Sequence, residues 1–149
     1  MKIVKIIQWD MGHRVMNHRS VCKGLHGHRY KAEICLEGNV VNKSGISEEG
    51  MVIDFADIKK IANSFIQEKL DHSFMVWEKD TELLEFFNNS EGHKPVIVPF
   101  TSTAENVAAY IFNELESQFI DSFGTGLKLY SVKLWETPTS CAIYSVEDK

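Results

Sequence analysis

The stretch "CKGLHGHRYKAEICLEG", residues 22–38, sets two histidines, His26 and His28, at the point where a polar loop gives way to a segment of alternating residues. From Tyr30 onward, apolar and polar residues alternate with the period of two that is typical of a half-buried β-strand. The pattern predicts a strand over residues 26–38. Because alternate residues of a strand point to the same side of a sheet, it also predicts that the two imidazoles share one face.

A third histidine is expected beside this pair. Residues 2–10, "KIVKIIQWD", predict another strand, and His13 follows its end. If the two strands pair antiparallel, His13 falls next to His26 and His28. Three neutral imidazoles with one open coordination position form the arrangement of a catalytic zinc site. A His-x-His pair alone is equally compatible with histidines that are merely exposed or packed, and it is the third histidine that favours a metal.

The cysteines divide into one candidate for chemistry and two candidates for the core. Cys22 precedes His26 by four residues, in a loop that contains glycine. It is either a fourth ligand that closes a structural site or an acid/base group beside an open one. Cys35 and Cys141 lie inside strand-like segments and are predicted to be core residues. Three cysteines, an odd number, argue against a disulfide framework.

Length and composition predict one soluble globular domain over residues 1–149, with 44% hydrophobic and 25% charged residues. No run of about 18 apolar residues occurs, so no membrane partner is expected. The N-terminal segment lacks the apolar core and the cleavage site of a signal peptide, which favours a cytoplasmic location.

The charge of the chain is unevenly distributed. The net charge of −5 argues against nucleic acid as a partner. The window Met11–Ala32, however, contains no acidic residue and four of the six histidines. Its cations are Arg14, Arg19, Lys23, Arg29 and Lys31. Such a window suggests a small anionic ligand, although an exposed basic loop balanced by acidic helices is an alternative.

The rest of the chain predicts helices between two pairs of strands. The predicted elements are a loop over 38–50, a strand extension over 51–55, a helix over 54–70 capped by Asp54, a short helix over 81–89, a helix over 101–119 capped by Thr103, and a hairpin over 127–137 and 140–147. The order β-β-α-α-β-β favours an α+β fold, with an antiparallel sheet and helices on one face.

Five blocks of sequence, in order, resemble the 6-pyruvoyl-tetrahydropterin synthase superfamily. They are "CKGLHGH" (22–28), "GMVIDFADIK" (50–59), "LDHSFM" (70–75), "TSTAENVAAYI" (101–111) and "WETPTSCAIY" (135–144). The first is similar to the Cys-x-x-Leu-His-Gly-His signature of the family, in particular of its 6-carboxy-tetrahydropterin synthase branch in queuosine biosynthesis. Two segments depart from the family pattern. "WDMGH" (9–13) stands where the family usually has aromatic-x-Ala-Ala-His, and "FMVWEKD" (74–80) stands where it usually has Leu-Asn. A longer segment, 76–100, follows, and the sequence assigns no role to it.

The resemblance implies a fold, a partner and a reaction. The fold is the tunnelling fold, in which sheets of several subunits join into a barrel, commonly a homohexamer with active sites between subunits. The reaction converts 7,8-dihydroneopterin triphosphate to 6-carboxy-5,6,7,8-tetrahydropterin, with release of triphosphate and acetaldehyde. Zn²⁺ would be held by His13, His26 and His28.

The resemblance also implies roles for other residues. Cys22 would be the general base, and Asp71 with His72 a second acid/base unit. Glu136 would accept hydrogen bonds from the pterin ring. Further substrate contacts are assigned to Thr103 and Glu105, and, from charge alone, to Arg14 and Lys23 at the triphosphate. Without the family, Asp71 and His72 are compatible with a solvated helix end, and Glu136 with an ordinary strand surface.

Two alternative functions are open. A true 6-pyruvoyl-tetrahydropterin synthase is the first, but such enzymes usually carry a longer gap than the three residues between Cys22 and His26. A non-catalytic pterin- or metal-binding protein of the same fold is the second. The joint presence of Cys22, Asp71, His72 and Glu136 argues against it.

Overall fold

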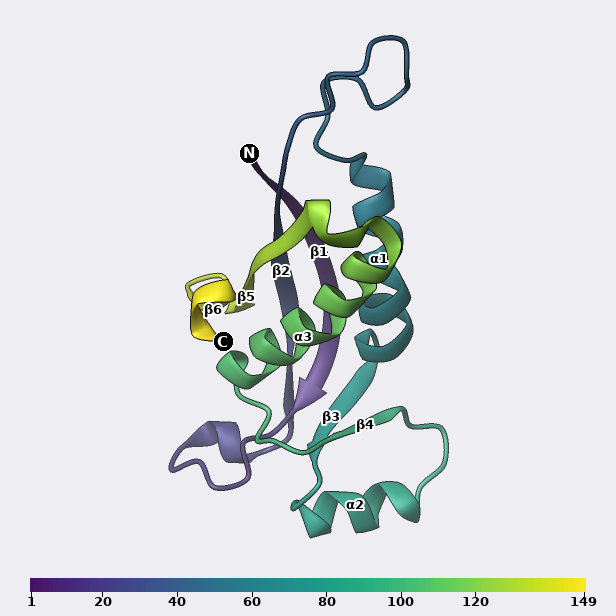
Figure 1. Ribbon diagram of the computed structural model, residues 1–149. Helices are drawn as coiled ribbons and strands as arrows, with labels where there is room; N and C mark the ends of the chain where they lie inside the picture. Colours follow the sequence, from purple (N-terminus) through teal and green to yellow (C-terminus); the bar gives the residue numbers. More distant parts are fainter.

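A six-stranded sheet forms the centre of the computed structural model, which describes residues 1–149 (Figure 1). Its strands are β1 (Lys2–His13), β2 (His26–Gly38), β3 (Ser73–Trp77), β4 (Pro95–Val98), β5 (Leu127–Thr137) and β6 (Ser140–Ser145). Their order across the sheet is β4-β3-β1-β2-β5-β6. The four longer strands pair antiparallel as predicted, whereas β3 and β4 are parallel additions at one edge.

The β1–β2 pair runs without interruption from Lys2↔Glu37 to His13↔His26. The first strand is therefore longer than the predicted 2–10, because its pairing with β2 continues to His13. The predicted strand over 51–55 is wrong: these residues lead directly into a helix whose first residue is Phe55.

Three α-helices accompany the sheet, and none of them combines the length and the apolar composition that a membrane crossing needs. They are α1 (Phe55–Phe65), which continues into the π-helical turn η2 (Ile66–Leu70), α2 (Thr81–Asn88) and α3 (Ala104–Phe123); short 3₁₀ turns are η1 (Val21–Lys23), η3 (Gly124–Gly126) and η4 (Val146–Asp148). Both predicted caps are present, since Asp54 accepts from the Ala56 amide and Thr103 from the Asn106 amide.

The helices α1 and α3 lie side by side over one face of the sheet (Figure 1). The residues that face the sheet from α3, and those of β2 that face the helices, are fully buried: Val107, Ala108, Ile111, Phe112, Leu115, Phe119, Tyr30, Ala32, Ile34 and Leu36. On the opposite face of the sheet, Val4 and Ile6 are 46% and 49% exposed. The predicted two-layer arrangement, with a core between sheet and helices, is confirmed.

The segment without an assigned role, 76–100, supplies most of a β3-α2-β4 unit that extends the sheet past the end of β1 (Figure 1). Arg14 ties this unit to β1, because its guanidinium donates to both carboxylate oxygens of Asp80, at 2.6 and 2.7 Å, and to Glu82 at 2.7 Å. Asp80 also caps α2 by accepting from the Leu83 amide. The hydrogen bonds from Arg14 hold the pKa of the Asp80 carboxyl below its usual range.

A close approach between β1 and β3 explains one departure from the family pattern. A Cβ added at Gly12 would lie 2.5 Å from the ring of Phe74. Glycine in "WDMGH", where the family usually has alanine, leaves the space that this ring fills. The two departures, at 9–13 and at 74–80, are thus two sides of one packing contact.

Candidate metal centre and active site

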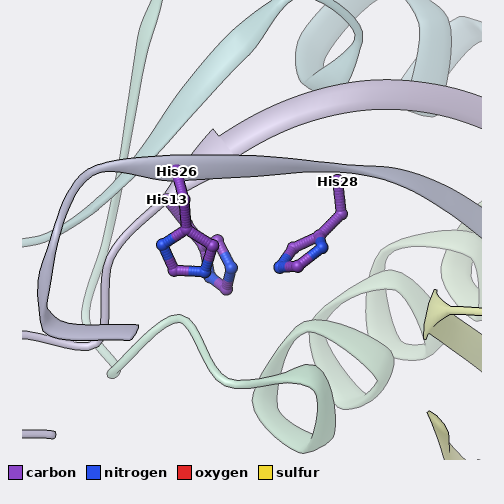
Figure 2. A group of neighbouring side chains, drawn as sticks. All are labelled: His13, His26 and His28. Atoms are coloured by element: carbon purple, nitrogen blue, oxygen red, sulfur yellow. The ribbon is translucent and has the colours of Figure 1, made fainter. Parts of the chain in front are cut away.

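Three imidazoles converge at the end of the β1–β2 pair, on the side that faces the helices (Figure 2). His13 is the register partner of His26, and His28 follows two positions along β2. Each ring offers one nitrogen, and these three atoms all lie within 4.8 Å of one another. The structure therefore brings together the three histidines that the strand pattern predicted, at a spacing that suits ligands of a single ion.

The fold fixes the orientation and the protonation of His13. Its Nδ1 lies 2.6 Å from the carbonyl oxygen of Ser102. Because a carbonyl oxygen only accepts, Nδ1 carries the proton and donates, and the lone pair is on Nε2. The ring is 1% exposed. Burial lowers the pKa of His13 to about 4; the bond to Ser102 opposes this shift, and the two other imidazoles add to it.

The other two histidines are half-buried at the rim. His26 Nδ1 lies 2.8 Å from the Gly24 carbonyl, which holds that ring in the same way. Burial lowers the pKa of His28 as well. An imidazole whose one nitrogen donates to a carbonyl presents its other nitrogen to a metal, as His13 and His26 do, so the donor set fits a divalent transition metal.

A cavity of about 230 Å³ adjoins His13 and is lined by half of the other predicted site residues. Cys22 comes from η1, Thr103 and Glu105 from the start of α3, and Glu136 from the end of β5. Cys141, predicted to be a core residue, is instead exposed and lines the same cavity, because β6 is an edge strand.

The side chains of Glu136 and Tyr30 lie beside Nε2 of His13. Glu136 Oε1 is 3.6 Å, and the Tyr30 hydroxyl 3.2 Å, from His13 Nε2. Burial, with the charge of Glu136 adding to it, raises the pKa of the Tyr30 phenol well above its usual value, so the group is a neutral O–H. Tyr30 had been predicted only as part of the apolar face. Its position two residues after His28 was the signal that it shares the face of the ligands.

Asp71 and His72 lie outside the cavity beside His13 and contact each other. Asp71 Oδ2 is 3.0 Å from His72 Nδ1, and Asp71 Oδ1 accepts from the Asp10 amide at 3.0 Å. Partial burial alone would raise the pKa of the Asp71 carboxyl, but these hydrogen bonds outweigh it and lower the pKa. The His72 side chain is 81% exposed, on backbone with φ of 55°.

His72 borders an open groove of about 440 Å³ that is also lined by His28 and by Asp10, Gly12, Gly27 and Arg29. Along β1 and β2 the last four residues alternate with His13, His26 and His28, so their side of the strands is the opposite face of the sheet. Within one chain, the structure does not bring Asp71 and His72 to the imidazole cluster.

The basic window is largely paired. Arg14 is bound to Asp80 and Glu82 through Nε and Nη2, and its predicted contact with a triphosphate stays a prediction. Arg29 pairs with Asp10 at 2.6 Å. Lys23 is exposed at the end of η1.

Comparisons with known proteins agree with the fold and the site. Residues 2–147 match the family described as 6-pyruvoyl tetrahydropterin synthase. A protein of Rickettsia conorii named 6-carboxy-5,6,7,8-tetrahydropterin synthase is 39% identical over 140 residues, which cover 92% of this chain and 94% of that protein. One of the same name from Haemophilus influenzae is 36% identical over 146 residues, with 96% and 97% covered. The structure of Caenorhabditis elegans 6-pyruvoyl tetrahydropterin synthase superposes with a TM-score of 0.66 at 28% identity, with 97% and 94% covered.

Proposed function

The chain belongs to the 6-pyruvoyl tetrahydropterin synthase family, and on that premise we propose that it is a 6-carboxy-5,6,7,8-tetrahydropterin synthase. In this proposal a single domain, 1–149, acts in the cytoplasm in queuosine biosynthesis. It converts 7,8-dihydroneopterin triphosphate and water to 6-carboxy-5,6,7,8-tetrahydropterin, triphosphate and acetaldehyde. The observation that carries the proposal is the cluster of three imidazoles, of which His13 lines a cavity together with Cys22 and Glu136.

The proposed cofactor is Zn²⁺, held by His13, His26 and His28. The convergence of their nitrogens supports this choice, because zinc prefers imidazole nitrogen and a catalytic site keeps one position open. When bound, the ion supplies Lewis-acid polarisation of the substrate's side-chain hydroxyls, which acidifies the neighbouring C–H bonds.

Cys22 is the proposed general base. It lies in the cavity but outside the group of nitrogens, which supports an acid/base role over a fourth ligand. The Val15 amide donates to the Cys22 carbonyl at 2.8 Å and holds the turn that presents the thiol. As a thiolate, Cys22 takes a proton from the substrate side chain.

The proposed pterin contacts are carboxylates and a hydroxyl on the cavity wall. Glu136 and Glu105 offer acceptors to the amino and ring N–H donors of the pterin, and Thr103, the N-cap of α3, supplies the hydroxyl. Lys23, exposed on η1, is a proposed cation for the triphosphate. Arg14 is the second proposed cation, with Nε and Nη2 bound to Asp80 and Glu82.

Product analysis tests the function and separates it from both alternatives. Purified protein loaded with Zn²⁺ is incubated with 7,8-dihydroneopterin triphosphate, and products are identified by mass. We expect the 6-carboxy compound together with acetaldehyde. A 6-pyruvoyl product without acetaldehyde would assign the chain to the other branch. Bound pterin without turnover would leave only the binding protein of the same fold.

The proposed assembly is a homo-oligomer, a hexamer by family resemblance, with active sites between chains. Asp71 and His72 support it, because in one chain they lie on the face of the sheet opposite to the imidazoles. A second chain that offers its own Asp71–His72 pair to the imidazole face would complete the site. There His72 would exchange a proton with the substrate, and Asp71 would orient and charge the ring.

Mixing inactive variants tests this shared site. Cys22→Ala and His72→Ala are each expected to be inactive alone. When co-expressed, they should recover about a quarter of wild-type activity, because random pairing of two chains leaves about one site in four with both groups intact. Turnover is measured on oligomers shown to contain both variants.

The control is a mixture of Cys22→Ala with Glu136→Gln. Both residues line the same cavity of one chain, so no pairing restores a complete site and the mixture should stay inactive. Equal behaviour of the two mixtures would mean that each site is complete within one chain.

A further inference from the structure

A buried tyrosine hydroxyl lies under the metal centre, and neither the strand pattern nor the proposed chemistry uses it. Tyr30 is 0% exposed and stacks on Trp9 with ring centroids 5.5 Å apart. Its ring meets the rings of His13 and His28 edge-on, at 6.0 and 5.6 Å. Packing from several sides thus holds the ring, and only the hydroxyl hydrogen is free to turn.

The hydroxyl has two polar neighbours, both at the centre. It lies 3.2 Å from His13 Nε2, and Glu136 Oε1 lies 3.6 Å from the same nitrogen. Because the Ser102 carbonyl fixes the proton of His13 on Nδ1, Nε2 has only a lone pair to offer, and the tyrosine is the donor in that contact.

A metal ion and the hydroxyl compete for the same lone pair. An ion held through His13 Nε2 would use that pair, and the Glu136 carboxylate beside the same nitrogen would then be the acceptor at hand. A buried hydroxyl that donates to nothing is disfavoured, so in the metal-loaded centre the O–H would turn toward Glu136.

We propose that Tyr30 is a positioning residue, whose hydroxyl donates to Glu136 in the metal-loaded centre and fixes the carboxylate where it meets the substrate. The inference rests on the proposed function for the identity of the substrate. It assigns to a rigid core side chain the placement of a mobile carboxylate at the end of β5, next to the turn into β6. The hydroxyl thereby links metal loading to the geometry of the cavity.

The test begins with Tyr30→Phe, which keeps the packed ring and removes the hydroxyl. We expect one Co²⁺ per chain and an unchanged fold, with kcat lower by about tenfold or more, the usual scale for loss of a group that orients a metal site. KM should change much less, because Glu136 itself is still present. Tyr144→Phe, on β6 and packed against Phe112, is the matched control and should behave as wild type.

A double-mutant cycle on Co²⁺ affinity, followed by the visible absorption of the bound ion, gives a readout that needs no turnover. The four proteins are wild type, Tyr30→Phe, Glu136→Gln and the double variant. If the hydroxyl orients the carboxylate, Glu136→Gln should weaken Co²⁺ binding less when Tyr30→Phe is already present. The coupling should be about threefold or more.

The outcomes separate this inference from the proposed function. The role of Tyr30 is overturned if the change in Co²⁺ affinity of the double variant equals the product of the two single changes to within twofold. A wild-type kcat in Tyr30→Phe overturns it as well. Absence of Co²⁺ uptake by the wild-type protein overturns the metal centre and the inference with it. Coupled Co²⁺ affinities in a protein that does not turn over the pterin support Tyr30 and overturn the proposed reaction.

Discussion

Replacing His26 with alanine should abolish tight metal binding and turnover together. The centre has three nitrogens within 4.8 Å of one another, and two imidazoles alone hold an ion poorly. Affinity should fall by more than about 100-fold, beyond what loss of a supporting hydrogen bond causes. His26 is preferable to His13 for this test because it is half-buried at the rim, whereas His13 is 1% exposed and its loss would also disturb packing.

Metal content after dialysis and turnover with added Zn²⁺ are the two measurements. His93→Ala is the control, since His93 packs against Phe86 and Phe87, in the β3-α2-β4 unit and outside the cluster. A His26→Ala protein that keeps its full metal content would show that the ligand set has been assigned wrongly.

Replacing Cys22 with alanine should separate chemistry from metal binding. The thiol lines the cavity without belonging to the cluster of nitrogens, so the variant should still bind one ion per chain. Turnover should drop by about two orders of magnitude or more, the scale on which loss of a general base acts. Metal analysis and single-turnover kinetics on the same preparation give both quantities.

Cys35→Ala serves as the control for this variant. Cys35 lies on β2, half-buried, outside both the cavity and the cluster, and burial raises the pKa of its thiol, as expected for an inert cysteine. It should keep metal and activity. If Cys22→Ala instead loses the ion, the thiol is a fourth ligand and the centre is a closed structural site.

The sequence predicted the parts of the fold where local pattern and tertiary structure coincide. The strand over 26–38 matches β2 at both ends, because one of its faces is buried and the other is not, so the alternation is clean. The apolar face of α3 and its Thr103 cap follow in the same way from helical spacing and a hydrogen bond within four residues. Pairing of two such strands was enough to place His13 beside His26.

The features of the fold that the sequence did not predict depend on contacts between segments that are distant in the chain. β3, "SFMVW", is a short parallel strand with neighbours on both sides, so its apolar run has no period of two to detect. Arg14 counted as a free cation until the fold placed Asp80 and Glu82 against it. The face on which Asp71 and His72 lie, likewise, depends on how η2 turns into β3.

The ladder between β2 and β5 begins only at Lys31↔Trp135, so the first five residues of β2 are hydrogen-bonded to β1 alone. At the same corner β1 has partners on both sides, since β3 joins it at Met11–His13. The strand end that carries two of the three imidazoles therefore opens more readily in local fluctuations than the part of β2 that is paired on both sides. An ion held by His13, His26 and His28 would join this end to β1, so in the proposed enzyme the metal would also close the sheet at this corner.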